Sequence, residues 1–103
     1  MVVIWQEQAK NDLKDYLDHT RIITEGKARK YILSLVDYAN SLAEFPYLGK
    51  SFYHYNNIEI RQLLYEMHRI FYYIKNNEVI IISVIHTSRS IENTMKYLKN
   101  IFQ

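Results

Sequence analysis

The sequence contains no cysteine, only one proline and only two glycines among its 103 residues. Without cysteine the chain has no disulfide, no thiolate metal site and no cysteine nucleophile. Proline and glycine are the residues that most often interrupt helices and strands. Their scarcity therefore predicts regular elements joined by short connections.

Long hydrophobic runs are also missing. The longest have five residues, at 1–5 and 70–74, and Val-Ile-Ile-Ile at residues 79–82 has four, whereas a membrane-spanning helix needs about 20 apolar residues. Residues 1–8 have neither the basic start nor the apolar stretch of a signal peptide. We therefore expect no membrane association and a cytoplasmic location, which the absence of cysteine also fits.

The charge excess of one sign is small, because 13 Lys and Arg residues face 11 Asp and Glu residues, a net charge of +2. Such a balance does not by itself argue for nucleic-acid binding. What the chain has in quantity is apolar material: 49% of its residues are hydrophobic, with ten Tyr and four Phe. This content is enough for one core in one domain of roughly 100 residues.

The first half of the chain predicts one strand followed by two helices. A β-branched and aromatic run at residues 2–5 predicts the strand. Ala9, Leu13 and Tyr16 recur at helical spacing after it. A second helix, with Thr24 as its N-cap, has an apolar stripe from residue 28 to residue 42 and ends before Pro46. The two helices, joined near residues 20–26, should pack as an antiparallel hairpin.

The second half predicts a loop, three strands and a helix. Residues 46–57 are interpreted as loop because Pro46, Gly49 and two adjacent asparagines punctuate them. Strands are expected at residues 58–64, 67–74 and 78–86, as an antiparallel meander, and a helix capped by Ser88 or Ser90 at residues 90–102. The order β-α-α-β-β-β-α gives an α+β domain of two layers, an antiparallel sheet covered by the helical hairpin.

These elements resemble the RelE/ParE superfamily of bacterial toxins. Trp5, Ala9, Asp12-Leu13 and Tyr16 are similar to the first strand and helix of that family, and Phe45-Pro46 with Gly49 to the loop after its second helix. Residues 60–63, 68–72 and 79–84, with His86 and Arg89, are similar to its three-strand sheet and exit. Each motif is short, but together they cover nearly the whole chain in the family's order.

The resemblance implies a toxin of a type II toxin–antitoxin pair, neutralised by a cognate antitoxin protein. RelE-like members cut messenger RNA on the ribosome, whereas ParE-like members inhibit DNA gyrase and are not known as nucleases. The chain lacks the paired loop lysines of RelE-like enzymes, which favours the gyrase branch. Both targets remain open from the residues, as does a non-catalytic interaction domain or inactive homologue.

Arg69 and Arg61 are the first candidates for catalysis. In RelE-like relatives an arginine at the place of Arg69 acts on the scissile phosphate, and the guanidinium fork fits a phosphate while staying protonated. The alternative for Arg69 is a structural role, with its stem on apolar surface or its charge paired to Glu59 or Glu66. For Arg61 an ion pair within the sheet is the plainer interpretation.

His86 is the third catalytic candidate, because its pKa lies near neutrality. A strand-end histidine hydrogen-bonded to the chain is the alternative. Lys50 and Arg89 are expected to contact RNA or a protein partner, and Tyr73 belongs to a group of sheet tyrosines that pack or stack on a base. The four histidines lack the spacing of metal ligands, so we expect no metal and no cofactor.

Overall fold

The computed structural model describes residues 1–102, apart from the side chains of residues 21–25. In chain order the elements are β1 (Val2–Trp5), α1 (Glu7–Asn40), the 3-10 turn η1 (Ser41–Ala43), β2 (Lys50–Tyr55), β3 (Ile58–Tyr65), β4 (His68–Lys75), β5 (Glu78–His86) and α2 (Ile91–Ile101). Among the described residues, no helix is long and apolar enough to cross a membrane.

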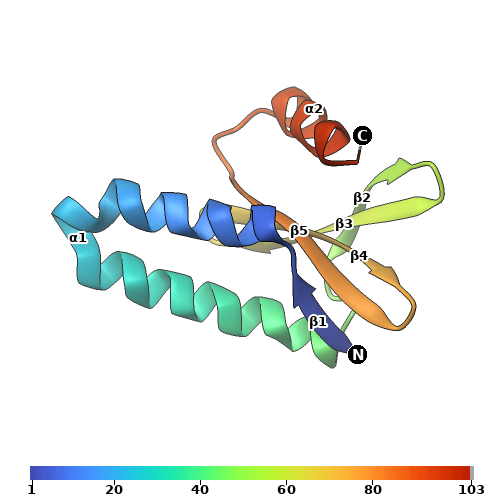
Figure 1. Cartoon of the computed structure of the whole chain (residues 1–103), viewed down its shortest axis with the longest axis horizontal. Coiled ribbons are helices and arrows are strands. Elements are labelled where there is room, and N and C mark those ends of the chain that lie inside the picture. The colour runs from blue at the N-terminus through green and yellow to red at the C-terminus, as the bar shows by residue number, and fades with distance from the viewer. Residues whose placement is uncertain (103) are drawn as a thin grey trace.

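The long helical segment α1 runs out and back as a hairpin (Figure 1). As one straight rod its 34 residues would be about 51 Å long, more than the 42 Å of the longest axis of the molecule. The rings of Tyr16 and Tyr31, one from each half, are 5.5 Å apart. The predicted antiparallel pair of helical arms is therefore confirmed, whereas the predicted cap at Thr24 lies outside the described side chains.

The sheet has five strands in the order β1-β5-β4-β3-β2. β1 pairs with β5 in parallel, and the other neighbours are antiparallel. β2 corrects the prediction, since residues 50–55 were interpreted as loop. The asparagines taken as loop punctuation form a tight hairpin turn instead, with Asn56 at φ 55°, a left-handed conformation that asparagine tolerates.

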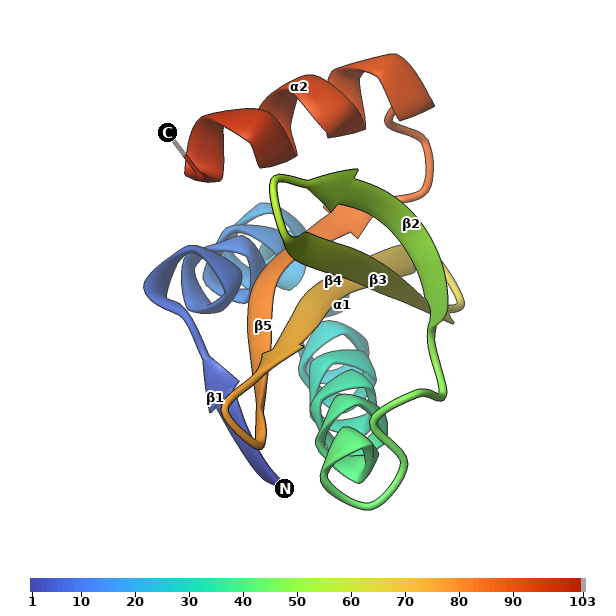
Figure 2. The ribbon, with the colours of Figure 1, turned by 90° about the vertical axis from the view of Figure 1, so that its right-hand side faces the viewer.

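The two faces of the sheet are covered by different helices (Figure 2). One face packs against α1 through buried Leu35, Ile70 and Tyr72. This is the predicted two-layer core, which is confirmed. The other face packs against α2 through Phe71, Ile82 and Leu98 and others. The predicted last helix therefore packs on the same domain.

The loop before β2 is fixed to the sheet by Tyr72. The Tyr72 hydroxyl donates to the Pro46 carbonyl at 2.8 Å and accepts from the Gly49 amide at 3.0 Å. A Cβ at Gly49 would lie 2.6 Å from the Gln62 carbonyl oxygen and 2.8 Å from the Tyr72 ring. Only glycine fits this contact, so the loop enters β2 at one defined place.

Candidate functional site

The six candidate residues separate into three pairs on three surfaces. Lys50 and Arg69 line one concavity, Arg61 and Tyr73 a second, and His86 and Arg89 a third. The three concavities have similar volumes of about 350 to 360 Å³. We call them the Arg69 groove, the Arg61 notch and the His86 pocket.

Arg61 and Arg69 point to opposite faces of the sheet. Arg61 pairs across the strands with Tyr72, which packs in the core under α1. Arg69 lies two residues before Phe71, which packs under α2. Because side chains alternate along a strand, Arg69 shares the α2 face with Phe71. One phosphate therefore cannot contact both guanidinium groups.

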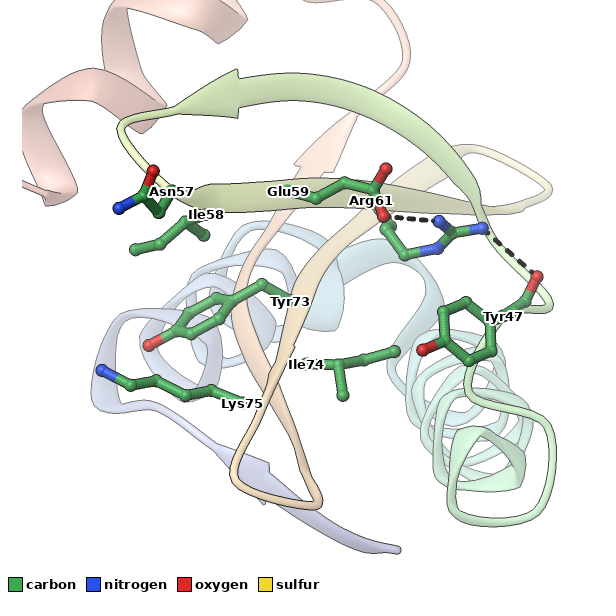
Figure 3. A pocket seen from close by; sticks show the side chains of 8 residues that line it. All are labelled: Tyr47, Asn57, Ile58, Glu59, Arg61, Tyr73, Ile74 and Lys75. Atoms are coloured by element: carbon green, nitrogen blue, oxygen red, sulfur yellow. Dashed lines mark hydrogen bonds and ion pairs between the residues drawn. The ribbon is translucent and has the colours of Figure 1, made fainter.

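The Arg61 notch lies where β3 and β4 separate (Figure 3). Their last cross-strand pair is Arg61 with Tyr72; beyond it residues 58–60 pair only with β2, and residues 73–75 only with β5. The side chains that line the notch include Tyr47, Glu59, Arg61, Tyr73 and Lys75. Tyr73 sits at its wall, with its ring 5.8 Å from that of Phe102.

The Arg61 charge is already engaged. Its Nη1 lies 2.8 Å from Glu59 Oε1, and its Nη2 donates to the carbonyls of Gly49 and Tyr47. The side chain is 14% exposed, and its guanidinium lies 5.1 Å from the Tyr47 ring centroid. The hydrogen bond from Arg61 holds the pKa of Glu59 below its usual range. This is the ion pair within the sheet that the sequence favoured, and it also ties the loop to β3.

Arg69 has fewer hydrogen-bond partners than Arg61. Its Nη1 donates to Gln62 Oε1 at 2.9 Å, and it forms no ion pair with any described residue. Neither Glu59 nor Glu66, the partners considered from the sequence, pairs with it. Lys50 lies directly across the strands from Gln62. Two cations thus share the Arg69 groove with one neutral amide between them.

The His86 pocket contains two histidines whose rings meet edge to face, 5.2 Å apart. His86 is exposed at the end of β5, and its Nδ1 accepts from the Ser88 amide at 3.0 Å. This matches the chain-bonded histidine considered as the alternative to catalysis. Arg89 stacks over the Tyr97 ring at 4.9 Å and so links the pocket to α2.

His68, the partner of His86, is 5% exposed and shares a 2.8 Å hydrogen bond with the Tyr31 hydroxyl. Burial, and then the nearby charge of His86, lower the pKa of His68 to about 4. Burial also raises the pKa of Tyr31 to about 12. At neutral pH His68 is therefore uncharged and Tyr31 keeps its proton, so the pair works as a structural contact between α1 and the sheet.

Asp12 is the polar residue that sequence reasoning undervalued. Its Oδ2 accepts from Ser83 Oγ at 2.7 Å and from the Val84 amide at 2.9 Å, and its Oδ1 accepts from Gln8 and from Tyr97 of α2. β1 pairs with β5 only as far as residue 81. Beyond that residue, the Asp12 carboxylate accepts hydrogen bonds from the edge of β5 in place of a strand neighbour. The sequence did contain a signal for this role, because Asp12 is an acidic residue within the apolar stripe that includes Ala9 and Leu13.

The described residues contain no group of three or more His, Asp or Glu side chains arranged to hold a metal ion. The three concavities carry charged and hydrogen-bonding groups at separate places. The Arg69 groove has cations beside apolar surface, and the Arg61 notch has a guanidinium already paired with a carboxylate. The His86 pocket has two imidazoles and a guanidinium. None of the three concavities gathers the three predicted catalytic groups.

Comparison with known proteins shows similarity to one protein family and to solved structures. The family described as "ParE toxin of type II toxin-antitoxin system, parDE" matches residues 3–91, which ends where α2 begins. A chain of the solved chromosomal ParDE TA system from P. aeruginosa superposes with a TM-score of 0.71 at 22% identity, covering 84% of this chain and 95% of that one. That similarity shows the fold. A search of curated proteins found no match.

Proposed function

Since the chain belongs to the ParE toxin family of type II toxin–antitoxin systems, we propose that it arrests growth by inhibiting DNA gyrase and that a cognate antitoxin neutralises it. It is a toxin that binds its target, not an enzyme. We place its action in the cytoplasm, where gyrase works. The resemblance to ParE-like toxins supplies the target, and the arrangement of the charged residues supports it.

The observation that carries the proposal is the separation of the predicted catalytic groups. Metal-free cleavage of RNA needs the phosphate, the attacking 2′-hydroxyl and the leaving oxygen to be contacted together, because such catalysis depends on positioning and charge. Arg61 and Arg69 lie on opposite faces of the sheet. Arg61 is also neutralised by Glu59 at 2.8 Å.

We expect the target to bind surfaces of the protein whose side chains take no part in packing the hydrophobic core. We propose the outer side of the helical hairpin and the solvent side of α2. On the hairpin, Lys27, Arg29 and Lys30 surround Leu33, which is 59% exposed. A cluster of cations around an exposed apolar side chain suits a protein surface of opposite charge.

Ribosome-dependent cleavage is the second candidate, and one observation favours it. The His86 pocket places an exposed imidazole near Arg89, with uncharged His68 beside it. Such a set supplies a proton acceptor and a phosphate contact. Two carboxylates, Asp12 and Asp15, line the same pocket, and their charge opposes the approach of a phosphate.

The test is a supercoiling assay with purified gyrase and relaxed plasmid, run beside a cell-free translation reaction probed by primer extension. We expect loss of supercoiling and no new 5′ ends on the message. Cleavage of translated message, lost in His86→Ala but kept in Lys75→Ala, would replace the gyrase proposal with the nuclease. An unaffected gyrase together with intact message would leave an interaction domain.

A further inference from the structure

β1 forms one border of the sheet and carries exposed apolar side chains. It pairs with β5 on one side and has no strand on the other (Figure 2). Val3 and Trp5 pack toward α1. Val2 and Ile4 alternate with them and point to the opposite face, where they are 62% and 37% exposed. Single exposed apolar residues are ordinary, but two of them on a strand with an open edge suit pairing with a further strand.

The hydrogen bonds between β1 and β5 determine which backbone groups of β1 stay unpaired. The amide of Gln6 donates to a β5 carbonyl at 2.9 Å. Because the backbone groups of successive residues point alternately to the two sides of a strand, those of Val2 and Ile4 also face β5. Those of Val3 and Trp5 therefore face the open side. Within residues 1–102 no other backbone group bonds to them there, so β1 offers an N–H and a C=O at each of these two residues.

The other open edges of the sheet carry features that oppose pairing with a copy of themselves. β2 has an irregular register with β3 and exposes Lys50 and His54. Residues 63–65 of β3 extend past the end of β2 and lie beside Lys50 and Arg69. Bulges and charged side chains are the usual means by which edge strands avoid one another. β1 has neither, because residues 2–5 are Val-Val-Ile-Trp and their register with β5 is regular.

We propose that β1 is the contact surface between two copies of this chain, which pair antiparallel along their β1 edges about a two-fold axis. Val3 of one copy then lies opposite Val3 of the other, and their N–H and C=O groups form two reciprocal hydrogen bonds. Side chains that lie opposite one another share a face of the sheet, so Val2 of one copy faces Ile4 of the other. This register pairs apolar residues with apolar residues and joins the two sheets into one.

A second copy is assigned because the edge is complementary to itself. A two-fold axis brings the same residues of both copies together, so a charged edge would repel its own copy. Residues 2–5 have no charged side chain, and they give a partner of opposite charge nothing to bind. A strand of four residues buries less than the roughly 1,200 Å² of a standard interface, so we expect a Kd on the order of 10 to 100 µM. The inference does not depend on gyrase or on an antitoxin.

The test is sedimentation velocity of the full chain at concentrations from about 5 to 500 µM, which span the expected Kd. The protein should change from monomer to dimer over this range and form nothing larger. Val3→Pro removes the N–H that faces the second copy and leaves the bonds to β5 in place. It should raise the Kd by more than about tenfold, because both reciprocal hydrogen bonds are lost. Ile4→Lys should raise it by a similar factor, because a charge replaces the apolar contact with Val2.

The matched control is Leu64→Lys, the same kind of change at a side chain that is 59% exposed on β3. It should change the Kd by less than about twofold, because Leu64 lies outside the proposed contact. Ile4→Lys combined with Val2→Glu tests the register. The two introduced charges then face each other across the axis, so the double variant should recover at least half of the loss in dimer. Circular dichroism spectra keep loss of folding apart from loss of pairing.

A chain that stays monomeric over the whole range would overturn the proposal. A dimer that persists in a folded Ile4→Lys variant and dissociates in Leu64→Lys would overturn it in favour of the β3 edge. Species that grow beyond the dimer would also contradict it, because pairing two β1 edges leaves no further edge of the same kind. If Ile4→Lys dissociates the dimer and the double variant does not restore it, the pairing of Val2 with Ile4 is wrong.

Discussion

Asp12 gives the sharpest test of how the helical hairpin, the sheet and α2 are held together. One carboxylate oxygen accepts from Ser83 Oγ and from the Val84 amide, at 2.7 and 2.9 Å. Asp12→Ala removes both contacts and leaves the amide of Val84, a residue 6% exposed, without a partner. Hydrogen bonds to a charged acceptor contribute about 1.5–3 kcal/mol each, and a stranded buried donor costs about 1–3 kcal/mol.

We expect Asp12→Ala to lower the free energy of unfolding by about 3 kcal/mol, because these terms overlap and the carboxylate is only partly buried. In a domain of this size that loss lowers Tm by about 12 to 24 °C. Asp12→Asn keeps an amide oxygen for the Val84 amide and should cost about 1 kcal/mol, since only the charge is lost.

Urea denaturation followed by circular dichroism measures the three free energies, with Asp15→Ala as the control. Asp15 lies one turn away on the same helix, and its side chain makes no hydrogen bond or ion pair among the described residues. The control should change stability by less than about 0.5 kcal/mol. If Asp12→Ala matched this control, or Asp12→Asn cost as much as Asp12→Ala, the reasoning about the β5 edge would be refuted.

Three further predictions concern single contacts. Burial holds the pKa of His68 at about 4, below about 6.5 in the unfolded chain. The unfolded state then binds more protons between these values, so stability should fall by about 2 kcal/mol from pH 7 to pH 5. His68→Gln should flatten that slope in urea titrations, and an unchanged slope would contradict the assignment. Tyr72→Phe should cost about 1–3 kcal/mol in the same assay, because the buried Gly49 amide loses its acceptor; a neutral result would show that the loop is held by other contacts. Ser90→Ala removes the cap of α2 and should cost about 1 kcal/mol, whereas Ser90→Asp should keep it; equal stabilities of the two variants would exclude the cap.

The fold was largely predictable because its local signals agree with its packing. Residues 2–5 and 78–86 form the expected strands, and the last helix begins after the Ser90 cap. β2 was missed because its polar, exposed edge position weakens the alternation of apolar residues, and because the Asn56-Asn57 turn has the same composition as a loop. The parallel pairing of β1 with β5 is a long-range contact that no local pattern encodes.

The site was less predictable because its geometry depends on which face each strand residue takes. The alternation of side chains along β4 is enough to place Arg69 on the face of Phe71. What the sequence did not give was that Arg61 faces the other helix, since the cross-strand register of β3 with β4 decides this. The same holds for Asp12, whose partners lie 71 and 72 residues further along the chain.

Because β3 and β4 separate beyond Arg61, the sheet also has two parts that differ in how many residue pairs join their strands. The β2–β3 hairpin is joined to the rest of the sheet by five residue pairs, from Arg61–Tyr72 to Tyr65–His68, whereas β4 pairs with β5 through eight. Backbone amides of β2 and of residues 58–60 should therefore exchange with solvent through local opening, at a lower free energy than global unfolding. Amides of β4 and β5 should exchange only when the whole domain unfolds. The β2–β3 hairpin also packs under α2, since Ile60 of β3 and Tyr55 of β2 belong to the same cluster as Leu98. Its opening should therefore expose this part of the core while β4 and β5 stay paired.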